Sequence, residues 1–174
     1  MKKYFLSAIL AAATVFQVNA QTKIYDFPFD GSLSASVGAG TFGNAGTSFV
    51  TDRHGVQNGA LSISNANGIT ATSGGLPLSN NPRSVSLWFN RKGAASTGLY
   101  VYGTNTNNQL FGIYFDAIGS PVFQAFGAGN DEPLNIANVM VNVWHHIVVT
   151  YNGSMVKVYL NGTLRNTFPR NLNT

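Results

Sequence analysis

The sequence predicts an all-β protein, and two observations carry this prediction. Short apolar runs rich in β-branched and aromatic residues recur between clusters of Gly, Asn, Ser and Pro, and none keeps a helical period over three turns. Two Asn-Gly pairs follow such runs near the C-terminus, and this pair favours hairpin turns because both residues tolerate a positive φ. No repeat of solenoid period and no dividing linker occurs, so we expect one domain.

The expected strands are the apolar runs that end at or beside a Gly, Asn, Asp or Pro. In chain order they cover residues 24–29, 61–64, 84–90, 99–102, 110–116, 122–126, 144–151, 155–160 and 163–168. Residues 37–46 and 134–143 show the same pattern in a more interrupted form, and we expect extended chain there too.

The hairpin over residues 144–160 has the most detailed prediction. A two-residue loop of type I′ at Asn152-Gly153 would place Tyr151 opposite Ser154 and would fix the register. The pairs expected on the core face are Val149–Val156, Ile147–Val158 and His145–Leu160, and those on the outer face are Val148–Lys157 and His146–Tyr159. Asn161-Gly162 supplies a second turn at meander spacing.

The first twenty residues have the order of a secretory signal peptide. Lysines at 2–3 precede an apolar run at 4–16, and the residues Val-Asn-Ala at 18–20 resemble a cleavage site. The run is shorter than the about 20 residues of a membrane span. We expect a signal-peptide helix over residues 1–20, an exported mature domain over 21–174 in the extracellular space, at the cell surface or in the periplasm, and no membrane span in the mature chain. A buried N-terminal helix is the alternative.

Composition narrows the functional classes. Only 9% of the 174 residues are charged, against about 25% in an average domain. Six carboxylates in all disfavour hydrolases that need several of them, and the lack of cysteine excludes disulfide bonds. Removal of the leader leaves eight basic and six acidic residues without a basic stripe, so nucleic acid is not an expected partner.

Four stretches carry a family resemblance. They are WHHIVVTYNGS at 144–154 continuing to VYLNG at 158–162, DRHGVQNGAL at 52–61, SVSLWF at 84–89 and YDFPFDG at 25–31. Together they resemble laminin-G-like domains of the concanavalin A-like lectin/glucanase superfamily, bacterial secreted type. The resemblance covers essentially all of the mature chain and implies a two-sheet antiparallel β-sandwich, the jelly roll.

The resemblance also implies a missing C-terminal piece. Members of this family continue past the last hairpin into a further strand that pairs back near the N-terminal strand, whereas this sequence stops at Thr174. We therefore expect the last strand or strands to be absent, further domains to lie beyond residue 174, and residues 24–29 to form an unpaired sheet edge.

Catalytic and zinc sites find little support. Glucanases of this superfamily use carboxylates at alternate positions of one strand, whereas Asp131 and Glu132 are adjacent and precede Pro133, which predicts solvated loop charges. His145 and His146 are neighbours on one strand and therefore point to opposite faces, which predicts structural roles. We expect a protein that is not an enzyme.

Calcium is the one metal that the resemblance supports. Related domains often bind Ca²⁺ on loops at a sheet rim through Asp, Asn and backbone oxygens, which suits this hard cation. By resemblance Asp52 and Asn58 lie on such a loop, with Asp30 and Asp131 as possible further ligands. The alternative is that these residues cap turns.

Two functions remain. The first is an exported recognition or adhesion module that binds a glycan or an extracellular protein, with Tyr100, Tyr102, Tyr114 and Tyr159 as aromatic platforms. Strand aromatics also serve sheet packing, which is the alternative for these tyrosines. The second is a ligand-free accessory or spacer domain of a larger secreted enzyme. The small number of carboxylates, and the adjacent positions of Asp131 and Glu132, disfavour glycoside hydrolysis by this chain.

Overall fold

The computed structural model describes residues 21–174 except 65, 67, 94–95, 128 and 138, so the predicted signal peptide lies outside the described residues. Within the described part the regular elements are strands. They are β1 (Thr41–Phe42), β2 (Thr47–Val50), β3 (Ala60–Ile63), β4 (Ala71–Thr72), β5 (Arg83–Asn90), β6 (Thr97–Gly103), β7 (Leu110–Phe115), β8 (Pro121–Gln124), β9 (Glu132–Pro133), β10 (Trp144–Tyr151), β11 (Met155–Leu160) and β12 (Thr163–Pro169). Nothing helical in these residues has the length and apolar character of a membrane-crossing segment.

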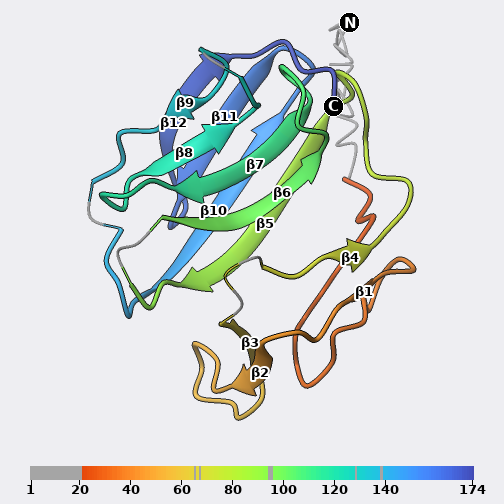
Figure 1. The fold of residues 1–174 in the computed structure, drawn as a ribbon, viewed down its shortest axis with the longest axis vertical. Coiled ribbons are helices and arrows are strands. Elements are labelled where there is room, and N and C mark those ends of the chain that lie inside the picture. The colour runs from red at the N-terminus through yellow and green to blue at the C-terminus, as the bar shows by residue number, and fades with distance from the viewer. Residues whose placement is uncertain (1–20, 65, 67, 94–95, 128, 138) are drawn as a thin grey trace, which may run out of the picture.

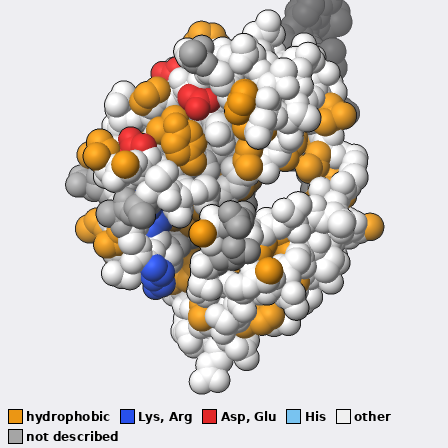
Figure 2. All heavy atoms as spheres, in the orientation of Figure 1, with side chains coloured by type: hydrophobic (Ala, Val, Ile, Leu, Met, Phe, Trp, Pro, Cys, Tyr) orange, Lys and Arg blue, Asp and Glu red, His pale blue; other side chains and the backbone are white. Residues whose placement is uncertain are grey.

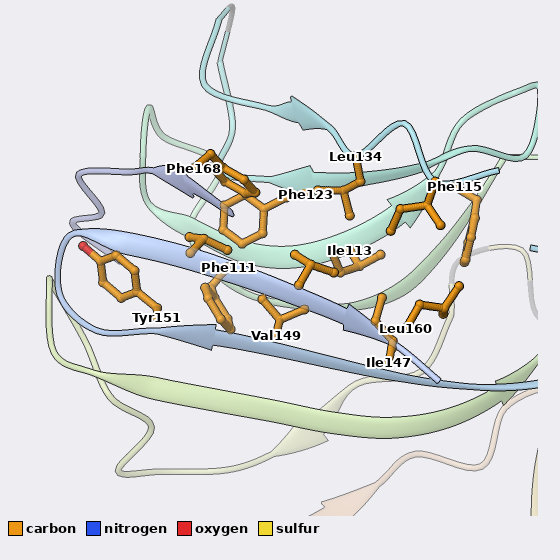
Figure 3. Packing of buried hydrophobic residues seen from close by; sticks show 14 of the residues in the cluster. Phe111, Ile113, Phe115, Phe123, Leu134, Ile147, Val149, Tyr151, Leu160 and Phe168 are labelled. Atoms are coloured by element: carbon orange, nitrogen blue, oxygen red, sulfur yellow. The ribbon is translucent and has the colours of Figure 1, made fainter. Parts of the chain in front are cut away.

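Two four-stranded antiparallel sheets face each other and form a β-sandwich (Figure 1). One sheet has the strand order β12-β11-β10-β5 and the other has the order β6-β7-β8-β9. Their facing sides bury one hydrophobic cluster (Figure 3), in which the rings of Phe123 on β8 and Phe168 on β12 lie 5.4 Å apart between centroids. Burial of this apolar surface is the main stabilising contribution. The predicted all-β sandwich is confirmed.

Burial alternates along β10 and β11 with the period of a strand. On β10, Ile147, Val149 and Tyr151 are buried and the residues between them are half-buried, and Val156 and Val158 continue the buried row on β11. Successive side chains of a strand point to opposite faces. The predicted core face of this hairpin is therefore confirmed.

The predicted register of the same hairpin is wrong by two residues. Tyr151 pairs with Val156, and Ile147 pairs with Leu160. Of the two turn residues only Gly153 has a positive φ, because the Asn152 carboxamide oxygen instead accepts hydrogen bonds from the backbone N–H of Met155, at 2.8 Å, and of the residue before it, at 3.1 Å. A turn with glycine at its first central position replaces the type I′ turn. A slip of two residues keeps every side chain on its predicted face.

The N-terminal part of the described chain lies outside the two large sheets (Figure 1). Strands β1 and β4 form one two-stranded sheet, and β2 and β3 form another. Residues 24–29 make only an isolated bridge between Asp26 and Val37. The predicted strand there, with its unpaired edge, is wrong, because the aromatic rings of this segment pack on one another, as described below.

Residues 134–143, position 138 aside, also contain no strand. Leu134 and Ile136 are buried in the sandwich core. Apolar residues in this loop anchor it without forming a ladder, which is why the run looked extended in the sequence.

Candidate functional site

An aromatic cleft of about 520 Å³ lies between the edge of β6 and the N-terminal segments. Its aromatic lining comes from both sides of the cleft: Tyr25, Phe27 and Phe42 on one side, and Tyr100 and Tyr102 of β6 on the other. The surface in Figure 2 is hollowed between the sandwich and the N-terminal part. A volume of this size lies in the range of small-molecule sites, about 300–1,000 Å³.

The N-terminal wall of the cleft is an aromatic stack. The rings of Tyr25 and Phe27 are nearly parallel at 12° with centroids 5.9 Å apart, and Phe42 meets Phe27 edge-on at 4.7 Å. The Tyr25 hydroxyl donates to the Gly74 carbonyl at 2.6 Å and accepts from the Gly74 N–H at 2.8 Å. These two hydrogen bonds to the Gly74 backbone fix the position of the Tyr25 ring at the start of the wall.

Close packing behind this wall requires glycine at position 38. Its φ is +81°, and a Cβ there would lie 2.5 Å from the Ile24 carbonyl oxygen and 2.6 Å from the Tyr25 ring. A side chain would therefore displace the ring that lines the cleft.

The β6 wall is held by a buried arginine. Arg83 is only 6% exposed, and its guanidinium donates to the Pro77 carbonyl at 2.6 Å, to the Ser79 carbonyl and to the Tyr102 hydroxyl at 3.1 Å. Burial raises the pKa of the Tyr102 phenol, and it raises the pKa of the Tyr100 phenol further. Both phenols are therefore neutral, and the cleft presents apolar rings rather than charge.

The four tyrosines predicted to bind ligand do not form one site. Tyr100 and Tyr102 line the aromatic cleft. Tyr114 alternates with buried residues on β7, and Tyr159 does so on β11, so both side chains point away from the core. Desolvation, followed by the charges of Asp131 and Asp116, raises the pKa of Tyr114.

Sequence reasoning missed Trp88 as a surface residue. Trp88 is 44% exposed on the outer face of β5, its ring stacks on His146 at 4.9 Å, and the Arg53 guanidinium carbon lies 4.6 Å from its ring centroid. The strand alternation could have found it, since Trp88 is in phase with Ser84 and Ser86. These contacts tie the loop before β3 to the sandwich.

Two of the predicted calcium ligands are engaged in turns. One oxygen of Asp52 accepts the N–H of His54 and of Val56, each at 2.8 Å, and these bonds lower the pKa of Asp52, the one from Val56 most. One oxygen of Asp131 accepts two backbone N–H groups at 2.9 Å each. Asn58 shares the loop of Asp52, whereas Asp30 is exposed in a different loop. Among the described residues, no three His, Cys, Asp or Glu side chains come together as a metal site.

Comparisons with known proteins agree with this architecture. A family model described as "Concanavalin A-like lectin/glucanases superfamily" matches residues 63–173. A solved structure, domain 4 of AbnA, a GH43 extracellular arabinanase from Geobacillus stearothermophilus in complex with arabinotriose, has the same fold with a TM-score of 0.61 at 19% sequence identity. The match covers 86% of this chain and 78% of that chain. A comparison with curated proteins finds no match.

Proposed function

Because the chain belongs to the concanavalin A-like lectin/glucanase superfamily, in its Laminin_G_3 family, we propose that it is an exported, non-catalytic module that binds a neutral glycan. The aromatic cleft is the observation that carries this proposal. Faces of aromatic rings are the apolar platforms on which sugar rings stack, and tyrosine adds a polar group at the edge. The arabinotriose bound to the domain of similar fold makes a neutral oligosaccharide the first ligand to test.

The carboxylates favour binding over hydrolysis. Glu132 forms an ion pair of 2.8 Å with Arg170, and Asp131 accepts the two backbone hydrogen bonds described above. Glycoside hydrolysis needs one carboxylic acid that donates a proton and one carboxylate that acts as nucleophile or base. Each of these adjacent side chains is engaged in a structural contact through one carboxylate oxygen, which supports binding rather than hydrolysis.

Removal of the cleft aromatics tests the proposal. We expect Tyr25→Ala and Phe42→Ala each to weaken arabinotriose binding about 5- to 30-fold, because each change removes roughly 1–2 kcal/mol of ring stacking. Isothermal titration calorimetry of the mature chain measures the affinity. Arabinotriose is titrated first, and a trisaccharide of neutral hexoses second.

Tyr159→Ala on the outer face of β11 and Phe49→Ala on β2 are the matched controls, since neither residue lines the cleft. Both variants should bind as the unchanged chain does. If Tyr159→Ala loses affinity for arabinotriose and the cleft variants do not, the glycan binds on the outer face of the sheet. That result would contradict binding in the cleft.

A spacer function is the second candidate, and the relative of similar fold favours it because that structure is one domain of an extracellular enzyme. A ligand-free accessory domain should show no saturable binding to oligosaccharides. Binding to an extracellular protein but to no glycan would support the recognition function with a different ligand class.

Calcium at the loop of Asp52 and Asn58 stays a prediction, and nothing in the glycan proposal depends on it. Ca²⁺ needs about six to eight oxygens, and the two predicted ligands on this loop offer the second carboxylate oxygen of Asp52 and the amide oxygen of Asn58. Bound calcium should raise the Tm in millimolar CaCl₂ relative to EDTA, by roughly a few degrees. Differential scanning calorimetry with Mg²⁺ as the control checks this. An unchanged Tm would contradict the prediction that this loop binds calcium.

A further inference from the structure

A second depression lies at the end of the sandwich where β10 turns into β11. We call it the rim pocket. It has a volume of about 390 Å³, and its polar lining consists of Asn108, Asn130, Ser154, Arg170 and Asn171. No residue lines both this pocket and the aromatic cleft. The two sites differ in chemistry as well, since carboxamides replace aromatic rings.

Backbone hydrogen bonds between distant segments hold the frame of the rim pocket. The Asn108 carbonyl accepts the N–H of Asn173 at 2.8 Å, and the Ser154 carbonyl accepts the N–H of Arg170 at 2.8 Å. The Tyr151 hydroxyl donates to the Gly153 carbonyl at 2.8 Å. These bonds join the loop after β6, the turn after β10 and the segment after β12, so the pocket is pre-formed.

The loop that carries Asn130 is strained where it meets the pocket. Phe126 has a φ of +70° and is followed by Gly127 at +94°, although a bulky side chain rarely adopts this region. The Phe126 carbonyl accepts the Asn130 amide at 2.9 Å and the Asn108 N–H at 3.3 Å. The strained residue thus positions two of the asparagines, and strain of this kind is often found at ligand sites.

The side chains of the pocket offer hydrogen bonds without net charge. Arg170 is neutralised by its 2.8 Å ion pair with Glu132. In the described part of the chain, the carboxamides of Asn108 and Asn171 make no hydrogen bond, and the Asn130 oxygen also makes none. Each free carboxamide supplies both an N–H donor and an oxygen acceptor.

We propose that the rim pocket is a second binding site, specific for the hydroxyl groups of a neutral sugar. Two neighbouring sugar hydroxyls can each donate to and accept from a carboxamide, which matches the free groups of Asn108 and Asn171. An anionic sugar would gain no unpaired cation, because Arg170, the charged residue of the lining, is already paired with Glu132. The pocket lacks aromatic rings in its lining, so it recognises hydroxyl geometry and binds more weakly than a stacking site.

Two variants with matched controls test the rim pocket. Asn108 has a φ of +59°, so Asn108→Gly removes the carboxamide in a residue type that accepts this conformation. Asn142→Gly is its control, because Asn142 is exposed with a φ of +60° and lies outside the pocket. Asn171→Ala is paired with Asn81→Ala, a second exposed asparagine outside the pocket.

The readout is two-dimensional NMR of the ¹⁵N-labelled mature chain titrated with arabinotriose, with a neutral hexose trisaccharide and with trigalacturonate. We expect saturable shifts of the Asn108 and Asn171 side-chain amides and of the Ser154 and Arg170 backbone amides with the neutral probes. The two backbone amides remain in Asn108→Gly combined with Asn171→Ala, and they should report roughly a tenfold loss of affinity at the pocket. The controls and Phe42→Ala should keep these shifts.

The failure of this inference is distinguishable from that of the proposed function. Chemical-shift changes at the aromatic cleft, with unchanged chemical shifts at the rim pocket, would overturn the rim site and leave the proposal of glycan binding intact. Tighter binding of trigalacturonate than of the neutral probes at the pocket would overturn the ligand class. Pocket shifts that survive in the double variant would overturn the assignment to these two residues.

Discussion

Replacement of Phe123 by alanine is expected to lower the free energy of unfolding by about 3–5 kcal/mol. The Phe123 side chain is fully buried, and its ring meets Phe111 on the neighbouring strand at 5.6 Å and Phe168 of the opposite sheet at 5.4 Å (Figure 3). The change leaves a cavity between the two sheets, and it removes two edge-to-face contacts at once. Urea unfolding of the mature chain, followed by circular dichroism, measures the loss.

Phe49→Ala is the matched control for this experiment. Phe49 lies on β2 in a small two-stranded sheet and is half-buried, so its removal should cost clearly less than the removal of Phe123. Equal losses in the two variants would contradict a single core between the large sheets.

The large sheets were predictable because their sequence pattern is local. On β10, buried residues at every second position determine both the strand and its inward face, and the 84–90 run behaves in the same way on β5. Antiparallel pairing of such faces produces the sandwich with little further information. The family resemblance added the two-sheet topology.

The hairpin register was harder because identical dipeptides form different turns. Asn161 and Gly162 both have a positive φ, at 51° and 79°, as a type I′ turn requires. At the other pair the asparagine stays outside the left-handed region and caps the turn with its side chain. The Asn161 side chain instead accepts the N–H of His146 on the neighbouring strand, and the dipeptide alone does not encode which partner its asparagine takes.

The N-terminal part and the cleft depend on long-range packing. Tyr25, Phe27 and Phe29 alternate as they would in a strand, yet Phe29 has a φ of 56°, and the rings stack on one another and on Phe42. Sequence reasoning identified Tyr100 and Tyr102 as candidate ligand contacts. It could not pair them with an aromatic wall about 60 or more residues away in the chain, because no local period joins the two segments.

Replacement of Arg83 by lysine is expected to lower the free energy of unfolding by about 2–4 kcal/mol, because two or more of its buried hydrogen-bond partners would lose their donor. Arginine reaches the Pro77 carbonyl, the Ser79 carbonyl and the Tyr102 hydroxyl with one planar group, and Asp and Glu side chains of the described chain form no ion pair with it. A lysine ammonium has a single nitrogen and cannot span these three oxygens. Urea unfolding compares this variant with Arg165→Lys, whose residue is exposed on β12.

The same variant separates stability from ligand binding at the cleft. Arg83 holds the segment before β5 against Tyr102, and this tyrosine lines the cleft. Because the hydroxyl of Tyr102 would keep only the Pro77 carbonyl as a partner, at 3.2 Å, its ring should become less fixed, and arabinotriose affinity should fall with stability. Tyr102→Phe removes the hydroxyl but keeps the ring, so it should cost less stability than Arg83→Lys and retain stacking. Unchanged affinity in Arg83→Lys, measured at a temperature where the variant is folded, would show that Arg83 supports the fold without ordering the cleft.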